Sequence, residues 1–218
     1  MSIGKKKNNN FYKEGLIIII SSPSGAGKTT ICEKIIKSDK KINLSISYTT
    51  RKKRKSEIHG KHYKFISKNK FKSMKKNNSF LESANVFGNS YASPIKDTKK
   101  IIKKGKDILF DIDWQGAKQI RKKFSDNLVD IFIMPPNVKE LRKRLIKRGQ
   151  DDIDTVDRRM KMAFNEMYHF NEYKYVLFND KLSLTLKKIQ NIILLERNYR
   201  STLKKIYNII YKNKKRKL

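Results

Sequence analysis

Residues 16–38 read LIIIISSPSGAGKTTICEKIIKS and carry three patterns in succession. Residues 16–21 form a short apolar run rich in isoleucine, which is typical of a buried β-strand. Residues 22–28 hold the serines, proline and glycines that favour a turn. Isoleucines then recur at helical spacing within residues 29–38. The segment therefore predicts a strand, a tight loop and a helix.

The loop matches the pattern of a phosphate-binding loop (P-loop). Gly25 and Gly27 let the backbone curl so that its N–H groups face phosphate oxygens, and the following helix adds the positive end of its dipole. Lys28 supplies a charge for the β- and γ-phosphates, and the Thr29 hydroxyl can hold Mg²⁺. Ser22 departs from the pattern, which usually begins with glycine. The residues predicted to bind ATP are Ser22, Pro23, Ser24, Gly25, Ala26, Gly27, Lys28, Thr29 and Thr30.

Further along the chain, short apolar runs alternate with helical patterns. This alternation is typical of an α/β fold with a mainly parallel sheet covered by helices on both faces, here a three-layer P-loop fold. Residues 45–94 interrupt it with short strands and turns, and we interpret them as a small inserted lobe. Residues 154–170 and 183–211 predict helices, the second broken at most once. Further strands are predicted at residues 44–50, 107–113, 128–134 and 175–178.

A set of short motifs narrows the function. The P-loop alone leaves open which acceptor is phosphorylated, and whether the protein is a hydrolase instead. The motifs are SISYTTRKKR (45–54), GKHY (60–63), FLE (80–82), GNSYAS (88–93), DIDWQG (111–116) and Arg148-Gly149, with Arg159 further on. In this order and spacing they resemble the guanylate kinase family over roughly residues 15–205. The resemblance implies transfer of the γ-phosphoryl group of ATP to GMP with Mg²⁺, in purine nucleotide metabolism.

The acceptor phosphate has four candidate ligands in these motifs. Arg51 and Arg54 can grip a dianionic phosphate with forked, charge-assisted hydrogen bonds. The phenols of Tyr63 and Tyr91 can donate to it as well. Taken alone, the arginines could equally be surface residues and the tyrosines core residues. The resemblance implies that the four together hold the phosphate of GMP.

Guanine presents two neighbouring donors, N1–H and N2–H₂, which one carboxylate can accept as a pair. The resemblance assigns this role to Glu82 and places Ser47 and Ser93 at the base. It also puts Asp111 near the acceptor nucleoside and Asp113 near the metal and its waters. Both aspartates end a predicted strand, where an Asp commonly organises Mg²⁺, so the sequence does not separate their roles.

Residues 144–160 resemble the helical lid of the family. Closure would bring Arg144, Arg148 and Arg159 over the transferring group, where they would neutralise charge and exclude water. Asn179 matches a turn on the adenine side and is predicted to contact ATP, although Lys181 replaces the usual Asp. The resemblance divides the chain into a core (15–44 and 95–205), an inserted GMP-binding lobe (about 45–94) and basic tails (1–14 and 206–218).

The composition bears on partners and location. The 218 residues carry 53 Lys and Arg against 20 Asp and Glu, a formal net charge of +33, with the lysines spread along the chain. This spread favours a solvated surface over a specific nucleic-acid site. No apolar run reaches the ~18 residues of a membrane span, and the single cysteine, Cys32, has no disulfide partner. We therefore expect a cytoplasmic protein without a membrane partner.

Three other functions fit parts of the pattern: a non-catalytic guanylate kinase-like binding module, a kinase with another phosphorylated acceptor such as a ribose phosphate, and a nucleic-acid-binding protein. The first would typically lack Lys28 or the acceptor arginines, and all of these are present. The second, a kinase for an acceptor such as a ribose phosphate, would not need Glu82 to recognise guanine. A homo-oligomer, and dGMP as a second acceptor, are left open.

Overall fold

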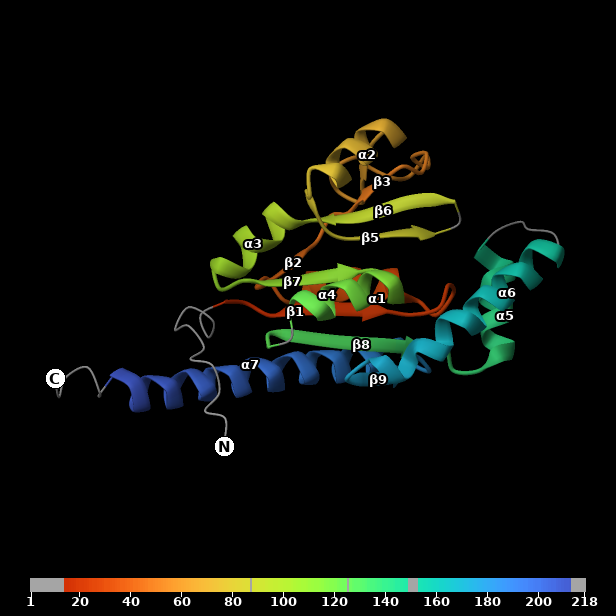
Figure 1. Cartoon of the computed structure of the whole chain (residues 1–218). Coiled ribbons are helices and arrows are strands. Elements are labelled where there is room, and N and C mark those ends of the chain that lie inside the picture. The colour runs from red at the N-terminus through yellow and green to blue at the C-terminus, as the bar shows by residue number, and fades with distance from the viewer. Residues whose placement is uncertain (1–13, 87, 125, 149–152, 213–218) are drawn as a thin grey trace.

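The computed structural model describes residues 14–86, 88–124, 126–148 and 153–212. Its centre is a five-stranded sheet in which all neighbouring strands run parallel (Figure 1). Parallel neighbours need long crossover connections, and helices supply most of them. The strands lie in the order β2 (Ile42–Leu44), β7 (Asp107–Asp111), β1 (Ile17–Ser21), β8 (Leu128–Met134) and β9 (Tyr175–Phe178).

The apolar run of β1 explains why helices cover both faces of this sheet. Side chains along a strand alternate between its faces. Ile18 and Ile20 pack in one core cluster with α1 and α7, whereas Ile17 and Ile19 pack in a second cluster with α3 and α4. The predicted three-layer α/β fold is thus confirmed. The helices of the two outer layers are α1 (Lys28–Ser38), α3 (Ile95–Lys103), α4 (Trp114–Lys123) and α7 (Leu182–Lys212).

Residues 45–94, which we call the lobe, carry a second sheet of four strands above the central one in Figure 1. Its order is β4-β3-β6-β5, with an antiparallel hairpin of β5 and β6. Gly88 at the hairpin turn has a φ of 72°, which favours glycine. The elements are β3 (Tyr48–Thr49), β4 (Lys64–Phe65), α2 (Lys68–Lys76), β5 (Phe80–Val86) and β6 (Asn89–Pro94).

Two helices project away from the sheets at the right of Figure 1, and we call them the lid. Leu141 and Leu145 of the first pack against Val156, Met160 and Ala163 of the second. This small core of their own holds the two helices together. The helices are α5 (Val138–Arg148) and α6 (Ile153–Met167), and α6 continues into the 3₁₀ turn η2 (Tyr168–Glu172).

The strand expected at residues 44–50 is in fact two short strands in different sheets. The N–H of Ser45 bonds to the carbonyl of Leu109 beside β2, and the chain then leaves the central sheet for β3 of the lobe. The helix expected at residues 183–211 is α7, which runs without a break over 31 residues. Within the described residues, no helix combines the length and the apolar character that crossing a membrane requires.

Two further boundaries differ from the expectation. The strand predicted to reach residue 113 ends at Asp111, because Asp113 caps the next helix, with its carboxylate accepting the N–H of Gly116 at 2.9 Å. The helix predicted at residues 154–170 ends at Met167 and tightens into η2. Such tightening is frequent at helix ends, where i→i+3 bonds satisfy leftover carbonyls.

Candidate active site

The candidate active site lies where the parallel strands end. The P-loop follows β1, Asp111 closes β7, and Asn179 follows β9. In an open parallel sheet, ligands bind beyond the carboxyl ends of the strands, because the loops of neighbouring strands meet there. The topology alone therefore brings together the P-loop, Asp111 and Asn179, all of which were predicted from sequence.

Two glycines of the P-loop are required by both conformation and space. Gly25 and Gly27 have φ values of 91° and 96°. A Cβ on Gly25 would lie 3.0 Å from the side chain of Leu141, and one on Gly27 would lie 2.8 Å from the amide nitrogen of Asn179. Gly27 is also the N-cap of α1, so the positive end of that helix dipole lies at the loop.

Asn179 supports the P-loop. Its buried amide nitrogen donates to the carbonyl oxygen of Ala26 at 2.8 Å. Its Oδ1 is buried without a hydrogen-bond partner among the described residues. This arrangement gives Asn179 a role in shaping the loop, whereas its contact with ATP stays a prediction.

We expect Gly27→Ala to weaken ATP binding and to lower the stability of the fold. The new Cβ would press on Asn179, and the positive φ would cost about 1–3 kcal/mol by itself. Gly88→Ala is the matched control, because Gly88 also has a positive φ but has no atom within 4 Å of an added Cβ. Thermal unfolding and KM for ATP are measured on both variants. Equal effects of the two substitutions would show that the contact with Asn179 is unimportant.

Lys28 and Thr29 face Asp111 across the strand ends. The ammonium group of Lys28 forms an ion pair with the carboxylate of Asp111, and the Thr29 hydroxyl lies 3.4 Å from its second oxygen. Burial alone would lower the pKa of Lys28, but the charge of Asp111 and its hydrogen bond outweigh burial and raise it. Lys28 is therefore a fixed positive charge within the P-loop.

The carboxylate of Asp113 has different hydrogen-bond partners from that of Asp111. Its carboxylate accepts from the N–H of Gly116 at 2.9 Å and from the side chain of Gln115 at 3.1 Å, both at the start of α4. The structure thus brings Asp111, rather than Asp113, to the Thr29 hydroxyl. The two aspartates thus differ in their contacts, and the roles expected of them at the metal and at the acceptor stay predictions.

Glu82, Ser93 and Ser47 form a buried polar chain in the lobe. The Ser93 hydroxyl donates to Oε1 of Glu82 at 2.6 Å, and the hydroxyls of Ser47 and Ser93 lie 3.3 Å apart. Only 4% of Glu82 is exposed. Burial raises its pKa to about 7 against the lowering effect of the Ser93 hydrogen bond, and the charge of Asp113 adds to the rise.

Arg51, Tyr63 and Tyr91 meet on another part of the lobe. The guanidinium of Arg51 lies 5.5 Å from the centre of the Tyr63 ring, which packs edge-on against Tyr91 at 5.8 Å. Both outer nitrogens of Arg51 bond to the carboxylate of Glu57, at 2.6 and 3.1 Å. Burial raises the pKa of Tyr63, the charge of Asp111 raises it further, and the charge of Lys28 lowers it.

The remaining predicted residues are placed as follows. Arg54 is exposed, and its backbone N–H donates to the carboxylate of Glu57 at 2.8 Å. Arg144 pairs with Glu140 on its own helix at 2.9 Å, and Arg159 is half-buried on α6. The side chain of Arg148 lies outside the described residues. In the P-loop, Ser22, Pro23 and Ala26 are buried, Ser24 is half-buried, and Thr29 and Thr30 are exposed.

Comparison with known proteins tests the family directly. The guanylate kinase family model matches residues 14–196. The chain belongs to the guanylate kinase family. The guanylate kinase of Rickettsia prowazekii is 47% identical over 187 residues, which cover 86% of this chain and 94% of that protein. The guanylate kinase of Mesorhizobium japonicum is 43% identical over 185 residues, 85% of each protein.

Solved structures agree with this family. A crystal structure of guanylate kinase from Anaplasma phagocytophilum matches with a TM-score of 0.72 and 35% identity, over 85% of this chain and 87% of that one. Membership in the guanylate kinase family makes the chain a nucleotide-binding kinase of the transferase class.

Two acidic residues of this guanylate kinase fold were missed by the sequence reasoning. Glu57 occupies the fork of Arg51. Glu166 of α6 accepts the N–H of Ser24 in the P-loop at 2.9 Å, which ties the lid helix to the loop. Glu166 follows Arg159 by seven residues, two helical turns, so both lie on one face of α6. This spacing from Arg159 was the sequence signal that could have pointed to Glu166, and no motif marks the position.

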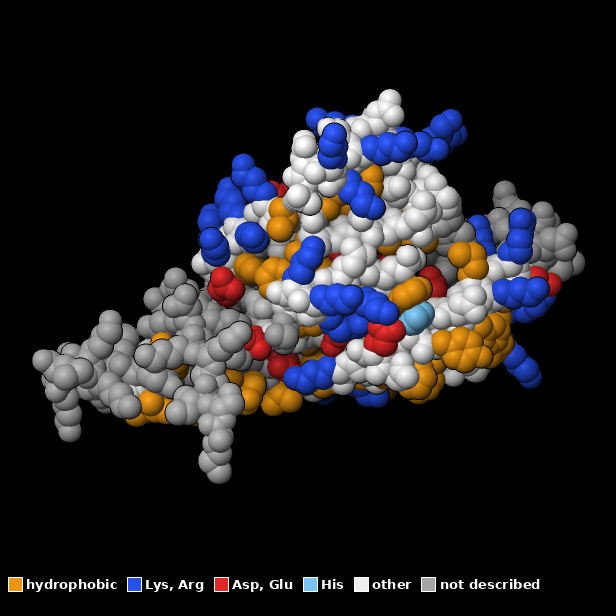
Figure 2. All heavy atoms as spheres, in the orientation of Figure 1, with side chains coloured by type: hydrophobic (Ala, Val, Ile, Leu, Met, Phe, Trp, Pro, Cys, Tyr) orange, Lys and Arg blue, Asp and Glu red, His pale blue; other side chains and the backbone are white. Residues whose placement is uncertain are grey.

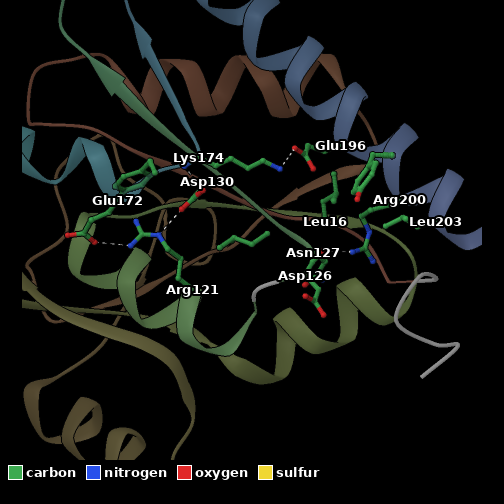
Figure 3. A pocket seen from close by; sticks show the side chains of 13 residues that line it. Leu16, Arg121, Asp126, Asn127, Asp130, Glu172, Lys174, Glu196, Arg200 and Leu203 are labelled. Atoms are coloured by element: carbon green, nitrogen blue, oxygen red, sulfur yellow. Dashed lines mark hydrogen bonds and ion pairs between the residues drawn. The ribbon is translucent and has the colours of Figure 1, made fainter. Parts of the chain in front are cut away.

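A hollow lies at the ends of the strands opposite to the candidate active site. It has a volume of about 700 Å³, and Figure 3 shows charged side chains along it. Arg121 bonds to Asp130 at 2.7 Å and to Glu172 at 2.9 Å, and Lys174 bonds to Glu196 at 2.6 Å. These ion pairs join α4, β8, η2 and α7, which indicates a structural role for the hollow.

The basic side chains are spread widely on the face seen in Figure 2. Lys and Arg side chains cover parts of the lobe, α3, α4 and the lid, with acidic side chains between them. This distribution agrees with the even spread of lysine along the sequence.

Proposed function

We propose that the protein transfers the γ-phosphoryl group of ATP to GMP, with Mg²⁺, and releases ADP and GDP. The observation that carries this proposal is the buried carboxylate of Glu82, held by Ser93 within a lobe that also presents Arg51 and two tyrosines. A buried acceptor pair suits guanine, and a cluster of donors suits a phosphate. GMP carries guanine at one end and a phosphate at the other.

The donor side is the P-loop. Its backbone N–H groups and the start of α1 favour a phosphate, and Lys28 adds a charge for the β- and γ-phosphates. The exposed side chains of Thr29 and Thr30 leave the loop open to a ligand.

The Thr29 hydroxyl and the Asp111 carboxylate suit Mg²⁺. They are oxygen donors 3.4 Å apart, and Mg²⁺ needs few protein ligands because it keeps several waters. When bound, Mg²⁺ would neutralise charge on the transferring phosphates. We assign this role to Asp111, and we assign to Asp113 the capping of α4.

The acceptor phosphate would be held by Arg51, Arg54, Tyr63 and Tyr91. The carboxylate of Glu57 occupies the forked side of Arg51 with the two-point geometry that a phosphate would also use. The phosphate of GMP would therefore compete with Glu57 for Arg51.

Catalysis on this arrangement rests on positioning and charge. The attacking oxygen of GMP is already anionic, so no general base is required. The lid arginines Arg144, Arg148 and Arg159 would neutralise charge on the transferring group when the lid closes. Closure would also exclude water, so that the phosphoryl group goes to GMP and not to hydroxide.

We predict that KM for GMP rises as the pH falls through neutrality. Glu82 reads guanine as a carboxylate, and a folded-state pKa of about 7 means that it gains a proton as the pH falls through that value. KM should rise about tenfold between about pH 8 and about pH 6. The phosphate of GMP also titrates near this range, with a pKa of about 6. Glu82→Gln is the control, since it retains only the effect of the phosphate, and an identical pH profile in both proteins would contradict the assignment.

The proposed function is tested by following ADP release with MgATP and each of GMP, AMP, CMP and UMP, and with no acceptor. Turnover with GMP alone is expected. Turnover with none of them, in a folded protein that binds ATP, would contradict the proposal. It would favour a binding module or another acceptor instead.

We also propose that the protein works in the cytoplasm in purine nucleotide metabolism, without a specific nucleic-acid partner. Membership in the guanylate kinase family supports the place in nucleotide metabolism. The spread of lysine over the surface and along the chain supports the lack of a specific nucleic-acid partner. Stoichiometric, saturable binding to an arbitrary duplex at physiological salt would contradict it.

A further inference from the structure

Strand β5, which carries Glu82, lies at the edge of the lobe sheet. On an edge strand, the backbone groups of alternate residues have no neighbouring strand on one side. The register shifts at Leu81, between Phe80 and Glu82. The carbonyl oxygen of Leu81 and both backbone groups of Ser83 bond away from β6, at the open edge. Helix α4 of the core packs along this edge.

Two side chains of α4 satisfy the open edge of β5. Oε1 of Gln119 accepts the N–H of Ser83 at 3.0 Å, while its Nε2 donates to the carbonyl oxygen of Ser83 at 2.8 Å. The side-chain amide thereby takes the place of the peptide group of a missing strand. The ammonium group of Lys123 donates to the carbonyl oxygen of Leu81. The residues on both sides of Glu82 are thus fixed to the core.

Gly116 completes the contact between α4 and the lobe. It precedes Gln119 by three residues, and therefore lies on the same face of the helix. A Cβ on Gly116 would lie 2.7 Å from Oε2 of Glu82, so glycine leaves the space that this oxygen uses. Since Ser93 bonds the other oxygen, Oε1, the carboxylate is bounded on both sides.

We propose that Gln119 is a positioning residue for guanine recognition. It fixes β5 to α4 so that the carboxylate of Glu82 meets both donors of the base at once; this role rests on the proposed function. A carboxylate can accept two hydrogen bonds from one rigid base only when its angle is fixed, because these bonds weaken steeply when misaligned. The core helix, and not the lobe alone, thereby sets base selectivity.

The test replaces Gln119 by methionine, which keeps the length of the side chain. It removes both hydrogen bonds with Ser83 and the longer one, at 3.2 Å, to the carbonyl oxygen of Gln115 on the same helix. Lys118→Met, exposed on the same helix, is the matched control. We measure KM for GMP and ATP, and the kcat/KM ratio of GMP to IMP, which lacks the 2-amino group. Gln119→Met should raise KM for GMP about tenfold and lower the GMP/IMP ratio several-fold. It should leave KM for ATP within about twofold of wild type.

A second variant tests the wider part of the proposal, that helix α4 sets base selectivity, if Gln119→Met does not fold. Gly116→Ala should also lower the GMP/IMP ratio, because the new methyl group displaces Oε2 of Glu82. An unchanged ratio in the folded variants, or an equal rise of KM for GMP and ATP, would overturn the positioning role. Failure of the wild-type protein to use GMP would instead overturn the proposed function, so the two failures are distinguishable.

Discussion

Replacing Lys28 by methionine should lower kcat about 10³-fold while KM for GMP stays within about threefold of wild type. Lys28 is a fixed positive charge, because its ion pair with Asp111 keeps it protonated. As the bond to the γ-phosphoryl group breaks in the transition state, negative charge develops on the leaving oxygen of ADP next to the P-loop lysine, so the loss falls on kcat. Methionine keeps the length of the side chain, which limits changes in packing.

Lys34→Met serves as the control for Lys28→Met, since Lys34 is exposed on the same helix. Steady-state kinetics of ADP release and thermal unfolding are measured on both variants. A folded Lys28→Met protein with kcat near that of wild type would contradict the catalytic role proposed for the P-loop. A loss of activity in the Lys34 variant would point to a general effect of lost charge.

Glu82→Gln should lower kcat/KM for GMP by about 10²-fold to 10³-fold, with KM for ATP nearly unchanged. Glutamine presents one acceptor and one donor, so its NH₂ group would face a donor of guanine. Xanthosine monophosphate carries an oxygen in place of the 2-amino group, and it matches that pattern. We therefore expect the variant to gain activity with xanthosine monophosphate as it loses activity with GMP.

Asn85→Ala is the matched control for Glu82→Gln, because Asn85 is exposed on the same strand. It should leave both acceptors as in wild type. Equal losses of ATP and GMP affinity in Glu82→Gln would mean that Glu82 serves the fold and not the base. Activity with GMP as high as wild type would exclude it as the guanine reader.

Local patterns were enough to predict most of the fold. The isoleucines at 17–20 indicated a strand buried on both faces, and the two helix layers that pack on it follow from their alternation. The strand at residues 44–50 was wrong because one apolar run was divided between two sheets. Nothing local marks the residue at which a chain leaves a sheet, since that depends on the partner strand β7.

The site was predictable where motifs carry the chemistry. Glu82, Ser93 and Ser47 lie together, and so do Arg51, Tyr63 and Tyr91, whereas Arg54 of the same predicted set is exposed. The binding roles of these residues stay predictions. The supporting residues were not predictable, because their roles depend on contacts between distant elements. Gln119 meets Ser83 from 36 positions away, and Glu166 meets Ser24 from 142 positions away. The proposed division of roles between Asp111 and Asp113 likewise rests on the position of the α4 cap.

The most direct test of guanine reading by Glu82 is the kcat/KM of the wild-type protein with GMP, IMP and AMP at about pH 8, where Glu82 is ionised. IMP keeps the N1–H donor of guanine and lacks the 2-amino donor, and AMP lacks both. The proposed function predicts GMP to exceed IMP by about 10²-fold, with no measurable turnover of AMP. Equal values for GMP and IMP, or turnover of AMP comparable to that of GMP, would contradict it.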